Sequence, residues 1–549
     1  ARTGNVMITP TPAAQPLVEW MLERGIEAAV PFEGAPVEEL LGNAPALMAA
    51  IRSLLLTDDA GALFVEAQAR HIAFGEVQSV AQAADNPQYQ FRQLYRRAPL
   101  NAHGTGDTDT GRGVTLPARL VRFRGTPVAE PRPPSSPVGP ASVIDLWPPR
   151  PEKSRLPDAA PTDKPLSGLR VLDLSWVLAG PFATRILGDL GADVVKVQHE
   201  PRATLVNQPD YPYYAVWNRS KRSATLDLKH PDALGAVRRL VERSDVLVEN
   251  YSSGVLTRLG LGYDQVKDWN PRLVYVSMSG PGHEGPWKDV ISYAPTIHAL
   301  CGLTHLTNPE GRGDVGCGFS LNDHAAGFAS AFSVLAALEA VERTGEGQYI
   351  DMAQLEIGTY LLGPAMIDFV NNGREAQPMG NRDGLADRVP NEVYRASDGH
   401  VAVTANDNVM WAALAGLVGL PADWDVEQRR AHRGAIDEGI AAWIADRTST
   451  QAMEDLQSLG VAAGKVQDAD DLFLDDPQHR ARRFWVECDH PVFGPRPHDR
   501  FPAIWSRSEL APYLLSPAYL GEANFDVWSG IAGLETEDVA EGMGNGLFS

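Results

Sequence analysis

The chain has 549 residues, of which 44% are hydrophobic and 21% are charged, a composition typical of a globular protein with more than one domain. Its 70 acidic and 48 basic side chains give a net charge of -22, which repels phosphate backbones, so we expect neither nucleic acid nor anionic membrane as a general partner. The three cysteines are too few and too scattered for a disulfide framework or a metal site, which favours a reducing, cytoplasmic location and no bound metal.

The N-terminal region contains a segment that recurs late in the chain. Glu66–Tyr95 is similar to Asp455–Trp485, and Leu116–Pro127 is similar to Phe501–Pro512. We therefore interpret residues 1–125 as a partial, decayed copy of the later region, and convergent helical composition is the alternative. The matched positions are Gly75 with Gly464, Val77-Gln78 with Val466-Gln467, and Asn86-Pro87-Gln88 with Asp476-Pro477-Gln478.

A proline-rich segment from about Arg124 to Pro165 separates this region from the rest of the chain. Such a composition is typical of an extended, semi-rigid linker. We therefore assign residues 126–165 to a linker, which is the clearest domain boundary in the sequence.

After the linker, short Val- and Leu-rich strands alternate with amphipathic helices. This alternation predicts an α/β fold with a parallel, doubly wound sheet. The expected strands are Arg170–Leu174, Asp193–Val197, Ala224–Leu228, Asp245–Glu249 and Leu273–Ser277, and the expected helices are Phe182–Leu190 and Asp232–Glu242.

One acidic residue stands between a turn and a long, alanine-rich helix. Leu321-Asn322-Asp323 leads into apolar sequence that ends at Arg343-Thr344-Gly345, so we expect Asp323 at the N-cap of that helix. Free backbone N–H groups and the positive end of the helix dipole would keep its carboxylate ionised and fix its direction. Capping alone is one interpretation of Asp323, and a catalytic role is the other.

From Val389 the pattern changes to a smaller α+β region. Pro390–Ala405 is typical of a β-hairpin with its turn at Asp398-Gly399, and helices follow it. Nowhere in the chain does an apolar run approach the roughly 18 residues that span a bilayer, and the N-terminus lacks the basic-then-apolar order of a signal peptide. We therefore expect no membrane partner.

Four segments together resemble the family III CoA-transferases, the CaiB/BaiF group, in order and spacing: Val171–Val197, Asn218–Leu228, Asp245–Tyr263 and Phe319–Met352. The resemblance covers about Pro165 to Leu534. It implies a large domain at 166–388, a smaller domain at 389–488 and a return to the large domain at 489–549, in protomers that interlock as a homodimer or higher oligomer. The N-terminal region would then be a partial copy of the smaller domain, without a nucleophile.

The resemblance implies a catalytic role for Asp323. An aspartate at this position is the family's nucleophile, which attacks a CoA thioester and forms first an aspartyl–acyl anhydride and then aspartyl-CoA. Tyr293 aligns with a family tyrosine beside the nucleophile and would hydrogen-bond its carboxylate, and a buried core tyrosine is the alternative. The chain would thus transfer CoA from an acyl-CoA donor to a carboxylic acid acceptor, with the CoA thioester as co-substrate and no tightly bound cofactor.

CoA carries phosphates and an adenine, so its site needs cations, an apolar face and tight backbone turns. Asn218–Arg222 clusters cations in a loop that enters a strand, and a solvated surface charge is the alternative for each of them. The resemblance, together with this cluster, assigns CoA contacts to Leu178, Ala179, Arg219, Lys221, Arg222, Asn250, Tyr251 and Arg258.

Departures from the family narrow the substrates. Ala294 stands where the formyl-CoA branch has an acidic residue, and Asn381–Pro390 replaces the glycine-rich lid of that branch, so both changes argue against formyl-CoA and oxalate as substrates. No role for Gln198 or His199 follows from the sequence.

Two alternative functions stay open. An α-methylacyl-CoA racemase needs a histidine–aspartate pair, which would fall at Tyr293 and Ala294, although His298 and His324 lie nearby in sequence. A non-catalytic CoA-binding subunit is the second alternative, and the Asp323 motif argues against it.

Overall fold

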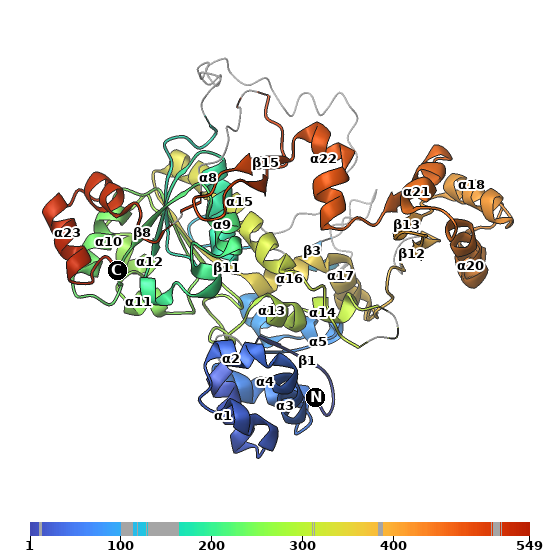
Figure 1. The fold of residues 1–549 in the computed structure, drawn as a ribbon, viewed down its shortest axis with the longest axis horizontal. Coiled ribbons are helices and arrows are strands. Elements are labelled where there is room, and N and C mark those ends of the chain that lie inside the picture. The colour runs from blue at the N-terminus through green and yellow to red at the C-terminus, as the bar shows by residue number, and fades with distance from the viewer. Residues whose placement is uncertain are drawn as a thin grey trace. The chain divides into compact units, whose positions relative to one another are not determined.

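The computed structural model describes residues 1–9, 14–99, 113–117, 119–127, 129, 164–309, 311, 313–382, 388–506, 508, 516–517 and 519–549 (Figure 1). Most of the segment assigned to a linker, residues 126–165, lies outside the described residues. The chain forms two compact units. Unit 1 comprises Ala1–Thr304, Gly316–Glu375 and Val486–Ser549, and unit 2 comprises His305–Val315 and Ala376–Trp485.

A seven-stranded sheet forms the centre of unit 1. Its strands run in the order β5-β11-β10-β9-β6-β7-β8, and every neighbouring pair is parallel except β5 with β11. The parallel α/β sheet predicted from the alternating pattern is therefore confirmed. The strands are β5 (Arg122–Phe123), β6 (Arg170–Asp173), β7 (Asp193–Gln198), β8 (Lys221–Thr225), β9 (Val246–Glu249), β10 (Val274–Ser279) and β11 (Gln348–Ala353).

Three strands differ from the expectation: β8, β5, and β11 (Gln348–Ala353), which was not among the expected strands. β8 begins at Lys221 rather than Ala224, because the Lys221 side chain is buried 2.9 Å from the Asp173 carboxylate, and a charged residue at a core position hides the strand pattern. β5 comes from the N-terminal region and adds an antiparallel edge to the sheet. A two-residue strand has no periodicity that the sequence could reveal.

Helices cover both faces of the sheet, because successive residues of a strand point to opposite sides. Val171 and Val246 pack on one face, and Leu172 and Leu247 of the same strands pack on the other. α8 and α15 lie side by side on the first face (Figure 1). The first face carries α8 (Ala179–Asp189), α9 (Pro212–Asn218) and α15 (Leu321–Thr344), and the second carries α10 (Ala233–Val241), α11 (Val255–Arg258), α12 (Tyr263–Val266), η6 (Phe525–Ile531) and α23 (Thr536–Gly544).

α15 corrects one expectation. Among the described residues it is the helix long and apolar enough to cross a membrane, so the statement that no apolar run approaches that length is wrong. However, 56% of its most apolar window is buried inside the protein, where it packs on α8 and the sheet. Its apolar composition is thus explained by its place in the core.

The N-terminal region belongs to unit 1. Its first helices share a core of their own, which includes Trp20, Ile51 and Phe74, and they lie together in the blue part of Figure 1. The β1–β2 pair then packs against α13 (Ala294–Leu300). The elements are β1 (Val6–Thr9), α1 (Ala14–Glu23), η1 (Glu27–Phe32), α2 (Val37–Gly42), α3 (Ala44–Leu55), α4 (Ala60–Ala69), β2 (Ala73–Glu76), α5 (Val80–Ala84), α6 (Pro87–Arg92), β3 (Tyr95–Pro99) and β4 (Gly113–Pro117).

Unit 2 is built on a three-stranded antiparallel sheet of order β12-β13-β14. The hairpin predicted around Asp398-Gly399 is present, with Arg395 opposite His400. Trp411, Ile440 and Leu456 form part of the core beside this sheet. The elements are β12 (Asn391–Arg395), β13 (His400–Thr404), α18 (Asn408–Val418), α19 (Val426–Ala431), α20 (Arg433–Ile444), α21 (Ser449–Ser458), β14 (Ala462–Lys465), η5 (Asp471–Asp475) and α22 (Pro477–Arg482).

The remaining elements are short. They are η3 (Glu200–Arg202), η4 (Leu205–Asn207), α14 (Leu303–Leu306), α16 (Gln354–Leu361), α17 (Gly363–Asn372), β15 (Trp485–Cys488) and β16 (Arg496–Asp499). β15 and β16 form a separate two-stranded sheet.

Candidate active site

The order of strands in unit 1 marks the site. From β6 the chain continues to β7 and β8 on one side, and then to β9, β10 and β11 on the other side. The loops that follow β6 and β9 therefore run in opposite directions from the carboxyl edge of the sheet. Ligands of open α/β sheets bind in the crevice at such a point.

A cavity of about 130 Å³ lies at this edge, and we call it the Asp323 cavity. The predicted residues Leu178, Ala179, Asn250, Tyr251 and Tyr293 line it together with Asp323. Six of the ten predicted site residues, which come from distant parts of the sequence, are thus gathered in one place. The other lining residues are Trp176, Val177, Ser252, Met278, Ser279, Gly280, Pro281, Lys288, Val290, Ile291, Ser292 and Gln354.

Asp323 lies in the first turn of α15, but not at its N-cap. The cap position is Ser320, and Asp323 is the third helical residue. Burial raises the pKa of the Asp323 carboxyl to about 7, and a hydrogen bond with the Gln354 side chain opposes that rise. This rise runs against the expectation that the helix end keeps the carboxylate ionised, because desolvation by burial is the largest influence on this pKa and favours the protonated form. Near neutral pH the group exists in both protonation states.

The neighbours of Asp323 are held firmly. The backbone N–H of Asn322 donates to Nε2 of His298 at 3.2 Å, and the Asn322 amide donates to the Gln354 carbonyl at 2.9 Å. Burial lowers the pKa of His298 to about 4, so its imidazole is neutral and Nε2 can accept. These contacts join the start of α15, beside Asp323, to α13 and α16.

Hydrogen bonds also hold the loop after β6. The Asn250 amide accepts from the N–H of Trp176 and donates to its carbonyl, both at 2.8 Å, and the N–H of Val177 donates to Asn207 at 2.8 Å. Val177 has a left-handed backbone with φ 63°, a strained conformation for a β-branched residue. Asn250 thus positions the backbone that leads into Leu178, at the start of α8.

A second cavity of about 420 Å³ lies beside the first, and we call it the Arg258 cavity. Tyr251 lines both cavities, so the two spaces share a wall. Arg258 faces the second cavity with Arg202 and Lys229, two cations that the sequence did not single out. Its other lining residues are Val197, Gln198, His199, Pro201, Leu226, Asp227, Leu228, Val255 and Leu259.

Gln198 has a structural role here. Its side-chain oxygen accepts from the Tyr214 hydroxyl at 2.6 Å, and its amide donates to the Asn207 carbonyl at 3.2 Å. Because Asn207 in turn holds Val177, Gln198 supports the loop after β6. His199 lies 3.8 Å from the Asp227 carboxylate at the rim of the Arg258 cavity.

The structure places the three cations of the Asn218–Arg222 cluster apart from the cavities. Arg219 donates to Asp189 at 2.8 Å, and Lys221 donates to Asp173 at 2.9 Å. Arg222 donates to Asp193 at 2.5 Å. None of the three lines either cavity in the described part of the chain, so their contact with CoA stays a prediction without support from cavity geometry.

Sequence reasoning missed Gln354, Lys288 and Ser279 in the Asp323 cavity. Gln354 and Ser279 stand at the carboxyl ends of β11 and β10, where the rule for parallel sheets could have found them. Lys288 lies in an irregular loop and carries no signal. Among the described residues, no group of three or more His, Cys, Asp or Glu side chains could hold a metal ion.

Comparisons with known proteins identify the family. The family model for CoA-transferase family III matches residues 166–524, and the chain belongs to this family. A succinate–glutarate CoA-transferase from Agrobacterium fabrum is 32% identical over 392 residues, which cover 68% of this chain and 96% of that protein. The human succinyl-CoA:glutarate CoA-transferase is 30% identical over 376 residues, which cover 65% of this chain and 84% of that protein.

A solved structure agrees. A CaiB/BaiF family protein from Brucella suis, 29% identical, matches with a TM-score of 0.61 over 67% of this chain and 100% of that chain. The chain is therefore an enzyme of the CoA-transferase class, and CoA-transferases use CoA thioesters as co-substrates. The first 165 residues lie outside the family match.

Proposed function

We propose that the chain transfers CoA from an acyl-CoA to a carboxylic acid through covalent intermediates on Asp323. The observation that carries the proposal is a carboxyl group with a pKa of about 7 in a cavity that shares Tyr251 with a larger, cationic cavity. A nucleophile and a binding site for a phosphorylated carrier are thus adjacent.

The Arg258 cavity supplies what the nucleotide end of CoA requires. Arg258, Arg202 and Lys229 offer cations to its phosphates, and Leu226, Leu228 and Leu259 offer an apolar face to its adenine. The pantetheine arm then passes Tyr251 and brings the thioester to Asp323. Because the chain has a net charge of -22, it repels an anionic substrate, and this local group of cations is needed to bind one.

The chemistry proceeds by exchange of carboxylate and thiolate. An Asp323 oxygen attacks the thioester carbonyl, the C–S bond breaks, and CoA leaves as the thiolate, which gives a mixed anhydride. The thiolate attacks the aspartyl carbonyl and releases the donor acid, leaving aspartyl-CoA. The acceptor carboxylate attacks the aspartyl-CoA carbonyl, the C–S bond breaks, and CoA thiolate leaves, which gives a second anhydride. The thiolate then attacks the acceptor acyl carbonyl, and the Asp323 carboxylate leaves, which forms the new acyl-CoA and regenerates Asp323.

Neutral donors in the cavity support the charge that develops on oxygen. Burial raises the pKa of Tyr293, so its phenol stays protonated and can donate. Gln354 donates to the Asp323 carboxylate and favours its ionised, nucleophilic form. Preorganised donors of this kind act strongly where water is excluded.

We propose dicarboxylic acids and their CoA thioesters as substrates. The two relatives described above act, by their names, on succinate or succinyl-CoA and glutarate. In this chain Lys288 is the cation that lines the Asp323 cavity, and an ammonium group there suits the second carboxylate of such a substrate. Neither His298 nor His324 lines this cavity, so no observation favours racemisation.

An isotope experiment tests the mechanism. The acceptor is glutarate labelled with ¹⁸O in both carboxylates, and the donor is succinyl-CoA. When the second anhydride collapses, one acceptor oxygen stays on Asp323, so mass spectrometry of the Asp323 peptide should show ¹⁸O after turnover. Turnover without label on that peptide contradicts the covalent mechanism. Absence of turnover across a panel of acyl-CoA donors and acids contradicts the activity itself.

A further inference from the structure

The loop between β10 and α13, residues 280–293, forms much of the Asp323 cavity. It supplies seven of the eighteen residues that line the cavity, among them Lys288. The loop is irregular, and inside it the N–H of Val290 donates to the carbonyl of Trp287 at 2.9 Å. A turn of this kind does not tie a loop to the rest of the protein, so the position of the loop depends on contacts from other segments.

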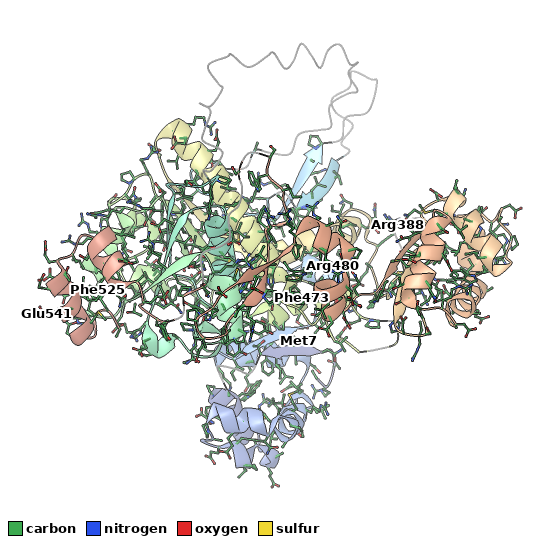
Figure 2. All side chains as sticks on the ribbon, turned by 45° about the horizontal axis from the view of Figure 1, so that its top comes forward. Met7, Arg388, Phe473, Arg480, Phe525 and Glu541 are labelled. Atoms are coloured by element: carbon green, nitrogen blue, oxygen red, sulfur yellow. The ribbon has the colours of Figure 1, made fainter. Side chains whose placement is uncertain are left out.

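The N-terminal region, which lies outside the family match, packs beside this loop in unit 1. Met7 of β1, labelled in Figure 2, stands opposite Gly75 of β2. A Cβ at Gly75 would lie 2.6 Å from the Thr296 carbonyl of α13, so only glycine fits there. The backbones of β2 and of the helix that follows the loop are therefore in direct contact.

α4 holds the end of the loop. The Gln68 amide of α4 donates to the Ile291 carbonyl at 3.0 Å, and its side-chain oxygen accepts from the Ile291 N–H at 2.8 Å. Phe64, one turn earlier on the same helix, packs edge-on against Trp287, with ring centroids 5.6 Å apart. One face of α4 thus contacts the loop on both sides of Lys288.

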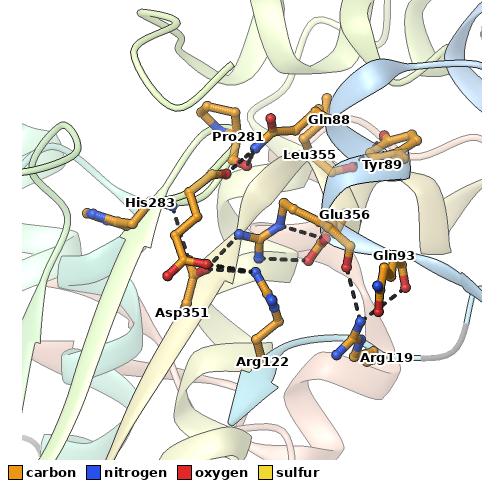
Figure 3. Close-up of polar contacts among 12 residues, drawn as sticks. Gln88, Tyr89, Gln93, Arg119, Arg122, Pro281, His283, Asp351, Leu355 and Glu356 are labelled. Atoms are coloured by element: carbon orange, nitrogen blue, oxygen red, sulfur yellow. Dashed lines mark hydrogen bonds and ion pairs between the residues drawn. The ribbon is translucent and has the colours of Figure 1, made fainter. Parts of the chain in front are cut away.

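α6 holds the start of the loop through Gln88, which is 0% exposed. The Gln88 amide donates to the carbonyls of Pro281 and Glu284, both at 2.7 Å (Figure 3). Its side-chain oxygen accepts from the Trp287 N–H at 2.9 Å. Gly285 has φ 107°, and a Cβ there would lie 2.5 Å from that oxygen. The loop can therefore follow this path past Gln88 only with glycine at position 285.

The same face of α6 reaches the corner where β11 joins α16 (Figure 3). The Tyr89 hydroxyl donates to the Leu355 carbonyl at 3.0 Å. Arg92 is 0% exposed and donates to Asp351 at 2.6 Å and to Glu356 at 2.7 Å. Because breaking a buried ion pair is strongly destabilising, this contact keeps α6 in place beside the loop.

The two glutamines hold the central part of the loop on either side of Lys288. Among the described residues, residues 285–292 form hydrogen bonds outside the loop only with Gln68 and Gln88. Trp287 precedes Lys288 directly, and Ile291 follows it by three positions. The position of Lys288 in the Asp323 cavity therefore depends on the N-terminal region.

We propose that Gln88 and Gln68 are positioning residues for Lys288, so that the N-terminal region sets the choice between a dicarboxylic and a monocarboxylic acceptor. Lys288 suits a second carboxylate only where its ammonium group faces the Asp323 cavity, and that depends on the path of residues 285–292. An ion pair weakens as its charges move apart, so release of the loop weakens the binding of dicarboxylic acids. Binding of CoA should not change, because the Arg258 cavity is lined by residues from 197 to 259. The inference rests on the proposed substrate class.

Hydrogen exchange, read at single residues by mass spectrometry, tests the contacts without reference to activity. The variants are Gln88→Leu and Gln68→Leu, and the control is Gln90→Leu, because Gln90 is exposed on α6 and bonds within the N-terminal region. The Trp287 amide should exchange at least about tenfold faster in Gln88→Leu, and the Ile291 amide in Gln68→Leu, since each loses its acceptor. Gln68 is only partly buried, so its variant decides the question even if Gln88→Leu does not fold.

Kinetics test the consequence for the choice of acid. With succinyl-CoA as donor, each variant should raise the KM for glutarate roughly threefold to tenfold and leave the KM for pentanoate and for succinyl-CoA unchanged. In a Lys288→Met background the same substitutions should have no further effect on the KM for glutarate, because they act through Lys288. Gln90→Leu should match the unaltered chain throughout.

Three results overturn the proposal while the proposed function stands. They are unchanged exchange at Trp287 and Ile291, faster exchange with an unchanged preference for glutarate, and a rise in KM that is equal for both acids or adds to that of Lys288→Met. The last of these would show a structural role only. If the unaltered chain takes glutarate and pentanoate equally well, the proposed substrate class fails, and the selectivity role of the glutamines fails with it.

Discussion

The two cavities of unit 1 share Tyr251 but differ in size and charge. The Arg258 cavity is about 420 Å³ and gathers Arg258, Arg202 and Lys229, whereas the Asp323 cavity is about 130 Å³ and holds a carboxyl group with a raised pKa. Burial raises the pKa of the Asp323 carboxyl. The same degree of burial in the Arg258 cavity would remove water from its cations and so weaken their binding of phosphate. The difference indicates that the chain separates the anchoring of CoA from the reaction at its thioester.

The largest expected effect comes from Asp323→Asn. It should lower kcat for CoA transfer at least about a thousandfold, because the amide is not a nucleophile and no neighbour replaces it. Binding of CoA, measured by calorimetry, should remain within about threefold, since the Arg258 cavity is intact. Equal loss of binding and turnover would show that the two cavities are not separate in function.

The same variant should gain stability at high pH. The carboxyl group titrates near pH 3.9 in the unfolded chain and near 7 in the folded one, so the folded state loses stability as the pH rises through this interval. Asp323→Asn removes that cost, and its Tm at pH 8 should exceed that of the unaltered chain by a few degrees. At pH 4 the difference should be much smaller.

Arg258→Ala should act on binding. Loss of a charge-assisted contact with phosphate, about 1.5–3 kcal/mol, should raise the KM for acyl-CoA roughly tenfold to a hundredfold with a smaller change in kcat. Arg238→Ala is the matched control, because Arg238 is an exposed arginine of α10 paired with Glu242 and lines neither cavity. A large fall in kcat with an unchanged KM would instead show that Arg258 acts in the chemical step.

Lys288→Met should change acceptor choice. The KM for glutarate should rise roughly threefold to tenfold, because a partly solvated ion pair contributes about 1 kcal/mol, and the KM for pentanoate should not change. An equal change in the KM for both acids would show that Lys288 does not bind the second carboxylate.

The smallest effect is expected for Gln354→Leu. In the unaltered chain kcat/KM should rise with pH through about 7 as Asp323 loses its proton, and then level off. Removing the hydrogen bond that lowers this pKa should move the midpoint to higher pH and reduce the rate at pH 7 by about tenfold or less. An unchanged midpoint would mean that Gln354 does not govern the ionisation of Asp323.

The sequence predicted the centre of this site better than its surroundings. Asp323, Tyr251 and Arg258 stand in motifs whose order is specific, and the structure brings each of them to a cavity. Arg202 and Lys229 follow strand ends without a motif, so only the folded sheet reveals them.

Charge patterns led to predicted CoA contacts that the cavities do not support. Arg219 and Lys221 look like a phosphate-binding cluster, yet both are buried in ion pairs with Asp189 and Asp173. A sequence cannot show whether a cation has an internal partner about 30 or 48 residues away, because that depends on which strands become neighbours. The alternating strands were predictable, since each carries its own local periodicity.

The contact between Arg92 and Glu356 also sets a minimum time before this part of the fold can form during synthesis. The two residues are separated by 264 positions, so at a synthesis rate of roughly 5–20 residues per second the ribosome needs on the order of 13 to 53 seconds to make the second after the first. The N-terminal helices can assemble their own core at once, because Trp20, Ile51 and Phe74 are all made early. Throughout that interval α6 lacks Asp351 and Glu356, the carboxylates that pair with Arg92 in the finished chain.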